Sequence, residues 1–291
     1  MSESARQHPY SAWAADFAAV VRRGQSLPLG GFPPAPRPEI RPEAPKALFF
    51  APHPDDETIQ GGLALRLLRE ARWRVINVAV TQGSKPPRQQ PRWEELKAAC
   101  HFLGFDLRQT APGGLAPVTP EARANAPEKW AAKVKIISTI LAEEKPQAIF
   151  FPHEHDWNDT HIGTHFLVMD ALRETTGLRC AMVETEFWGQ NDRPNLMVEY
   201  DSADVADLIA ATTFHVGEVE RNPYHVTALA WMLDNVRRGA ELVGGQGGAA
   251  PAFLFGQLFQ LRRWNDGRVE NIYEGGRFLP KTAAPDSLFG V

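Results

Sequence analysis

Apolar runs and amphipathic stretches alternate along most of the chain. Four runs have the composition of buried strands, at residues 46–51, 75–80, 148–151 and 179–187. Between these runs, apolar residues recur every three or four positions, which is typical of the buried face of a helix. The alternation predicts an α/β fold, in which a Rossmann-like, doubly wound and mostly parallel sheet carries helices on both faces.

Two flanking regions do not follow this alternation, and we treat residues 46–220 as the main domain. Residues 1–45 contain a predicted short helix, from about Pro9 to Arg23, and then a proline-rich tract that we interpret as an extended surface strap. Residues 221–291 are predicted to form a helical and hairpin extension with a turn near Asp266-Gly267. This extension is expected to pack on the same domain or at an interface between copies in a homo-oligomer.

Composition narrows the classes of partner. A formal net charge of -4 with mixed signs gives no reason to expect nucleic acid or an anionic membrane. No apolar run approaches the roughly 20 residues that span a bilayer, and the N-terminus lacks a basic and apolar signal segment. Cys100 and Cys180 are too few and too far apart for a disulfide framework or a thiolate metal site. We therefore expect a cytoplasmic protein that acts on a small molecule.

Polar side chains with potential chemistry follow two of the predicted strands. The first strand ends in the segment Pro52-His53-Pro54-Asp55-Asp56-Glu57, and the strand at residues 148–151 ends in a histidine- and aspartate-rich segment, residues 152–165. Parallel strands present their carboxyl ends at one edge of an open sheet, so the two clusters are expected to meet there.

Histidine and carboxylate side chains without cysteine suit a zinc ion, and a catalytic zinc site usually has three protein ligands. His53 and Asp56 lie three residues apart on a turn, and we choose His161 from the second cluster as the third ligand. Fe²⁺ is also feasible with this ligand set. Asp55 then remains free to accept a proton from the attacking water, and Glu57 is expected to support the site without binding the metal.

The motif Pro52–Glu57, with Gly61-Gly62 after it and Asp159-Thr160-His161 at a helix start, resembles the PIG-L/LmbE-like family of zinc-dependent N-deacetylases. The resemblance covers roughly residues 46–220. It implies that His53, Asp56 and His161 bind zinc and that Asp55 is the general base. It also implies that the substrate is an acetylated amino sugar or a similar amide, whose sugar an arginine at the position of Arg92 contacts in some members.

The second motif departs from the family pattern. The family usually has His-Pro-Asp-His, whereas this chain has Asn158-Asp159-Thr160-His161. Asn158 thus stands where a histidine is expected to help the reaction, and we assign it to substrate binding. His155, His165 and His215 are the candidates to take over the catalytic role of that histidine. Asp159 or Asp156 is the candidate acceptor that replaces the aspartate lost at Thr160.

Two alternatives to an N-acetyl hydrolase remain open. A metal-dependent hydrolase of another amide, of a thiol conjugate or of a phosphoester would use the same ligands. The departures at Asn158 and Thr160 are also compatible with a sugar- or nucleotide-binding module that has lost catalysis.

Overall fold

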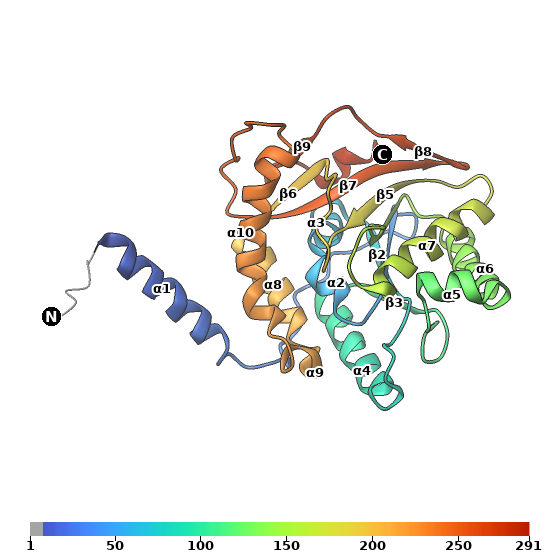
Figure 1. Cartoon of the computed structure of the whole chain (residues 1–291), viewed down its shortest axis with the longest axis horizontal. Helices are drawn as coiled ribbons and strands as arrows, with labels where there is room; N and C mark the ends of the chain where they lie inside the picture. Colours follow the sequence, from blue (N-terminus) through green and yellow to red (C-terminus); the bar gives the residue numbers. More distant parts are fainter. Residues whose placement is uncertain (1–7, 291) are drawn as a thin grey trace.

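A mixed β-sheet runs through the protein, which a computed structural model describes for residues 8–290 (Figure 1). Within these residues the sheet has nine strands in the order β3-β2-β1-β4-β5-β7-β6-β9, and β8 also pairs with β7. The strands are β1 (Lys46–Ala51), β2 (Arg74–Ala79), β3 (Asp106–Gln109), β4 (Ala148–Pro152), β5 (Arg179–Thr185), β6 (Leu196–Tyr200), β7 (Phe255–Asn265), β8 (Arg268–Asn271) and β9 (Arg277–Leu279).

Strand directions confirm the predicted mostly parallel, doubly wound sheet. The five strands from β1 to β5 are parallel to one another, and Ala47 of β1 pairs with Val75 of β2 on one side and with Ala148 of β4 on the other. β7 lies antiparallel between β5 and β6. The C-terminal region therefore supplies an internal strand of the sheet.

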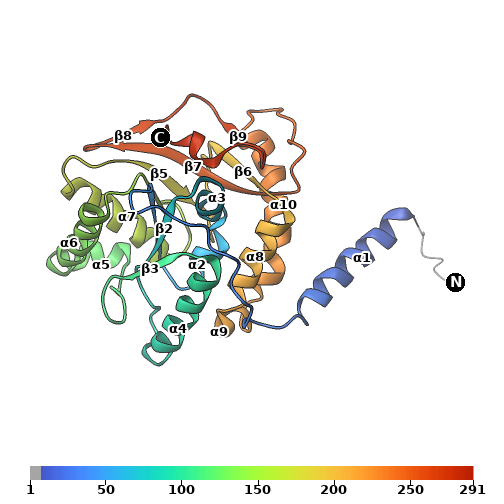
Figure 2. The same ribbon diagram turned by 180° about the vertical axis from the view of Figure 1, so that it is seen from behind.

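Helices cover both faces of the sheet (Figure 2). They are α1 (Pro9–Gly24), α2 (Asp56–Ile59), α3 (Gly62–Ala71), α4 (Pro86–Leu103), α5 (Pro120–Asn125), α6 (Pro127–Glu144), α7 (Asp159–Glu174), α8 (Ser202–Thr212), α9 (Val216–Val219), α10 (Tyr224–Leu242) and the 3-10 helix η1 (Pro285–Leu288).

Alternate residues of the central strands supply the cores of the two layers. Ala47 and Phe49 of β1 pack with apolar residues of α3, α4 and α8. Leu48 and Phe50 pack on the opposite face with α6 and α7. Because parallel strands are buried on both faces, the uninterrupted apolar runs of the sequence become central strands.

Residues before β1 reach the sheet along the surface. Figures 1 and 2 show α1 extending away from the rest of the protein. Residues 25–45 then follow without regular structure, held where Gly30 N–H donates to Thr213 Oγ1 at 2.9 Å and where Arg37 pairs with Asp106 at 2.8 Å. No helix in residues 8–290 has the length and hydropathy that crossing a membrane requires.

Two local elements differ from the sequence pattern. α4 begins at Pro86, although prolines at 86, 87 and 91 are unusual in a helix. Pro86 and Pro87 occupy the first turn, where a helix needs no N–H donors, so they are compatible with a helix start. The short strand β3 is not among the four predicted strands, because its four half-buried residues carry no apolar run.

The strand order changes direction between β1 and β4. β2 and β3 continue from β1 on one side, and β5 continues from β4 on the other. The loops after β1 and β4 therefore leave the same edge of the sheet next to each other, at the position where open α/β sheets bind their ligands.

We predict that Gly163→Ala destabilises the protein by about 1–3 kcal/mol, because an added methyl group cannot fit. A Cβ atom at Gly163 in α7 would lie 2.4 Å from the carbonyl oxygen of Val118, which is a backbone atom and cannot rotate away. Urea denaturation measures the change. Gly24→Ala is the control, because its Cβ would meet only the side chain of Val226, at 3.6 Å. Equal stability of the Gly163 variant and the wild type would contradict the prediction.

Candidate metal centre

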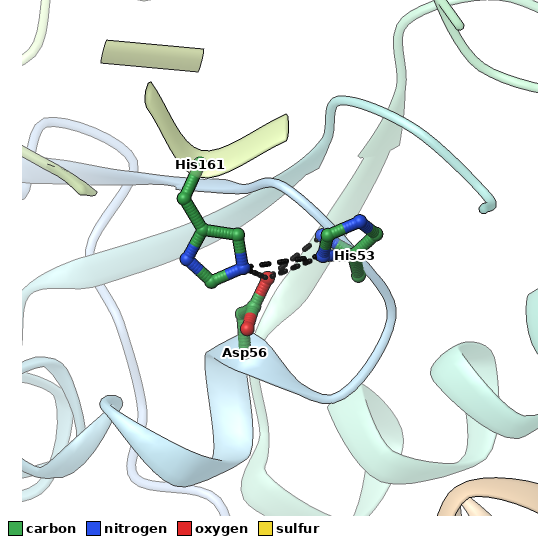
Figure 3. Close-up of side chains that lie close together, drawn as sticks. All are labelled: His53, Asp56 and His161. Carbon is green, nitrogen blue, oxygen red and sulfur yellow. Dashed lines mark hydrogen bonds and ion pairs between the residues drawn. The ribbon is translucent and has the colours of Figure 1, made fainter. Parts of the chain in front are cut away.

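Three side chains converge where the loops after β1 and β4 meet (Figure 3). His53 lies in the loop after β1, and Asp56 is the first residue of α2. His161 lies in the first turn of α7, which begins seven residues after β4 ends. The structure thus brings together the three residues that the sequence suggested as ligands, from positions more than a hundred residues apart.

The distances between their donor atoms fit a zinc ion. His53 Nδ1 and His161 Nε2 are 3.2 Å apart, and Asp56 Oδ2 lies 3.6 Å from the first and 3.5 Å from the second. Tetrahedral ligands at about 2.0–2.1 Å from zinc are about 3.3–3.4 Å from one another. The second oxygen of Asp56, Oδ1, is buried and has no hydrogen-bond partner within residues 8–290. The three residues therefore fit the metal that the motif implies.

Protonation of two of these side chains also favours metal binding. Burial lowers the pKa of His53, which favours the neutral imidazole. Burial alone would raise the pKa of Asp56, but His161 and His53 outweigh it and lower that pKa. A neutral imidazole and a carboxylate are the forms that bind metal ions.

Asp156 supports His161 from behind. Its Oδ2 atom lies 3.7 Å from His161 Nδ1, the ring nitrogen that faces away from His53 and Asp56. The same carboxylate accepts hydrogen bonds from the backbone N–H of Asn158 at 2.8 Å and of Trp188 at 3.1 Å. Of the two aspartates considered for this place, Asp156 occupies it and Asp159 is exposed. A carboxylate behind a ligating histidine fixes the orientation of its ring.

Asp55 has a strained backbone that its neighbours hold. Its φ of 123° is rare for a residue with a side chain. Its N–H donates to Glu57 Oε2 at 3.1 Å, and the other oxygen of Glu57 bonds His215 Nε2 at 2.8 Å. Both Glu57 and His215 are fully buried. Glu57 thus supports the backbone of Asp55 and does not join the three converging side chains.

The pKa of Asp55 is raised well above its usual value, first by burial and then by the charge of Asp56. Arg92, 3.9 Å away, opposes this shift. A metal ion beside Asp55 would also favour its ionised form, because bound cations are the largest local charges in such sites.

A small cavity of about 130 Å³ opens at these residues. Half of the residues that line it come from the PIG-L motif segments and the start of α4: His53, Asp55, Asp56, Arg92 and Asn158. Asn158 caps α7, because its Oδ1 accepts the N–H of Thr160 at 2.9 Å. Its amide NH₂ group therefore remains available as a donor. Both residues assigned to substrate binding thus lie at the cavity.

The model of the PIG-L family, described as GlcNAc-PI de-N-acetylase, matches residues 48–172. This segment contains every residue of the three-ligand cluster, together with Asp55. We call residues 48–172 the PIG-L domain, after the family whose model they match. No curated protein matches the chain.

Solved structures share the fold at low sequence identity. N,N'-diacetylchitobiose deacetylase from Pyrococcus horikoshii is 15% identical, with a TM-score of 0.53 over 89% of this chain and 94% of its own. GalB, the 4-carboxy-2-hydroxymuconate hydratase of Pseudomonas putida, is 14% identical, with a TM-score of 0.55 over 75% and 95%. The conserved protein TT1542 from Thermus thermophilus is 19% identical, with a TM-score of 0.52 over 74% and 93%.

The three other histidines considered as catalytic lie away from the cavity of the PIG-L domain. His155 is exposed, with Asp192 as its nearest carboxylate at 3.7 Å. His165 is buried and its Nδ1 bonds the carbonyl of Pro152 at 3.0 Å. His215 contacts Glu57, as described above. Among the described residues, none of these three histidines lines the cavity.

Five cavity-lining residues were not singled out as site residues by sequence reasoning. Only Trp188 could have been suspected from the sequence, because it directly follows the predicted strand at residues 179–187. The five are Phe187, Trp188, Glu218, Arg221 and Tyr224.

We predict that zinc stabilises the protein through the three converging side chains of the PIG-L domain. After treatment with a chelator, zinc at a free concentration of 100 times its Kd should add about 2.7 kcal/mol to the free energy of unfolding. His161→Ala should abolish this gain, because two ligands remain. Thermal unfolding with and without zinc measures it. The exposed His155→Ala should respond like the wild type, and a zinc response that survives in His161→Ala would refute the assignment.

We predict a pH-dependent stability that comes from His165. Burial lowers the pKa of His165 to about 4, whereas an unfolded histidine titrates near 6.5. Below pH 6.5 the unfolded chain therefore binds a proton that the folded protein refuses, so stability falls as pH falls towards 4.

His165→Asn retains a donor near the position of Nδ1 and removes this titration. Between pH 7 and pH 5 the wild type should lose about 2 kcal/mol more stability than the variant. Urea denaturation at both pH values tests this. His155→Asn, a change of an exposed histidine, should follow the wild type, and identical pH slopes for wild type and His165→Asn would contradict the prediction.

Proposed function

We propose that the protein is a zinc-dependent N-deacetylase that removes the acetyl group from an N-acetylglucosamine-like or related amide. The observation that carries the proposal is the triangle of donor atoms from His53, Asp56 and His161, with the carboxylate of Asp55 at the same cavity. The match to a family described as GlcNAc-PI de-N-acetylase supports the bond and the amino sugar. Fe²⁺ is the alternative metal.

The proposed chemistry divides between the metal and the chain. Zinc held by His53, Asp56 and His161 would polarise the amide carbonyl and make a water more acidic. Asp55 accepts the proton of that water as it attacks the carbonyl carbon. The strained backbone of Asp55 is fixed by Glu57, and in this conformation the carboxylate of Asp55 lines the cavity.

Two donors at the cavity serve the carbonyl oxygen and the substrate. The NH₂ group of Asn158 is proposed to donate to the oxygen on which negative charge develops, which is the position where a fixed donor contributes most. Arg92 donates one bond to the carbonyl of Pro54 at 2.9 Å, and its buried Nε lies 3.7 Å from Glu218 Oε1 without a hydrogen-bond partner among residues 8–290. A guanidinium remains protonated, so Arg92 binds substrate and does not transfer protons.

Asp55 is also proposed to return its proton to the leaving nitrogen. His155, His165 and His215 do not line the cavity, whereas Asp55 is at the reacting centre for both proton transfers. When the C–N bond breaks, the amine leaves with that proton and acetate is the second product. Burial, which raises the pKa of Asp55, suits a carboxyl group that must hold a proton between the two steps.

A hydratase is the second candidate, because GalB has this fold and adds water to a different bond. The fold therefore does not fix the reaction. Release of acetate from acetylated amino sugars, measured with the zinc-loaded protein, separates the two candidates. Amide substrates that yield no acetate, together with water addition to an unsaturated carboxylate, would favour the hydratase.

We predict that Asp55→Asn lowers kcat by at least about 10²-fold and leaves the zinc content unchanged, because the variant removes a base and no ligand. Asparagine tolerates a positive φ, so the fold should be retained. Acetate release and metal analysis on the same samples provide the measurement. Glu154→Ala, which changes an exposed carboxylate outside the cavity, is the control. Full activity of Asp55→Asn would remove Asp55 as the base.

A further inference from the structure

Five of the ten residues that line the cavity lie outside the PIG-L domain. These are Phe187, Trp188, Glu218, Arg221 and Tyr224, and all five follow residue 172, where the match to the family ends. They come from the segment after β5, from α9 and the turn after it, and from the start of α10. The reacting groups and the wall formed by these five residues thus come from different parts of the chain.

Aromatic rings make up much of this wall. The rings of Trp188 and Tyr224 lie 5.8 Å apart, edge to face, and Phe187 contacts both. Trp231 packs against Phe187 from α10 at 6.1 Å. The cluster continues to the metal centre, because Phe187 also lies edge to face with His161 at 4.9 Å. Trp188 is nevertheless 43% exposed.

The exposed position of Trp188 is fixed by its backbone. Its N–H donates to Asp156, the carboxylate behind His161. Gly189 packs so closely on the loop after β4 that an added Cβ would lie 2.8 Å from Asp156 Cα and from the carbonyl oxygen of His155. An aromatic ring held in place beside a cavity is already arranged for binding, so little freedom is lost when a ligand covers it.

The size of the cavity requires part of the substrate to lie outside it. Its volume is about 130 Å³, whereas pockets that enclose a drug-sized ligand have about 300 Å³ or more. The cavity can therefore enclose the acetamido end and its surroundings, and the rest of the substrate must lie over the rim. Trp188 offers an apolar face there, beside the Arg221–Glu218 pair, whose charged atoms are 2.7 Å apart.

We propose that Trp188, with Tyr224 and Arg221, forms a subsite for a second ring, attached to the unit that carries the acetamido group. The ring has an apolar face and a polar edge, as a pyranose has. Its face stacks on Trp188 and its hydroxyl groups meet Arg221. This assignment rests on the proposed deacetylase function and makes Trp188 a determinant of specificity, selecting substrates with two rings over substrates with one.

Acetate release from N,N'-diacetylchitobiose and from N-acetylglucosamine tests the subsite. The zinc-loaded wild type should have a lower KM for the two-ring substrate. Trp188→Ala should raise that KM about tenfold with little change in kcat, and should change the one-ring reaction by less than about twofold. Trp188→Phe should recover part of the loss. Trp157→Ala, which removes a tryptophan that is 79% exposed and outside the cavity, is the matched control.

Three results would overturn the subsite while the deacetylase function stands. These are equal loss of both reactions in Trp188→Ala, a fall confined to kcat, and a wild type that does not distinguish one ring from two. If the wild type releases no acetate, the proposed function fails separately. Calorimetric titration with N,N'-diacetylchitobiose then tests the subsite. Weaker binding by Trp188→Ala, with unchanged binding by Trp157→Ala, would support it. Any other result would reject it.

Discussion

The structure depends on the burial of several carboxyl groups at one edge of the sheet. Asp55, Asp56 and Glu57 are consecutive and buried, and Asp156 lies close by. An isolated buried carboxylate is costly unless it is neutralised or hydrogen-bonded. Each of the three consecutive carboxyl groups has its own partner: the two converging histidines face Asp56, Arg92 faces Asp55, and His215 bonds Glu57. A dication bound by His53, Asp56 and His161 would also offset the negative charge of the neighbouring carboxylates.

These compensating partners explain why the six-residue motif Pro52–Glu57 needs contacts from distant elements. Glu57 can hold the strained backbone of Asp55 only because His215, after α8, bonds its other oxygen inside the protein. Thr212 at the end of α8 also bonds Thr58 at 3.0 Å. The layer formed by α8 and α9 is therefore part of the site, although it brings no ligand. His215 was considered a catalytic candidate, and its contacts indicate a positioning role through Glu57.

The sequence predicted what is encoded locally. Uninterrupted apolar runs identified the central parallel strands, and polar clusters directly after two of them indicated an edge where His53, Asp56 and His161 would meet. β7 could not be placed in this way, because its position between β5 and β6 is set by pairing with strands that are 55 or more residues earlier. The contact of His215 with Glu57, 158 positions apart, also has no local signal. Asp156 and Asp159 were equally good acceptors until the geometry of the loop placed one of them behind His161.

Asp156 links the two halves of the cavity physically. One carboxylate faces the ring of His161 and also receives the N–H of Trp188, so the orientation of a proposed ligand and the position of the aromatic wall share one support. A substrate ring that stacks on Trp188 therefore contacts a residue whose backbone is hydrogen-bonded to the support of His161. Binding energy from that ring can help to align the amide at the reacting centre. The same connection limits how the wall can change. Substitutions that keep the backbone of Trp188 and Gly189 in place can alter the selected ring, whereas displacement of this loop would also disturb His161.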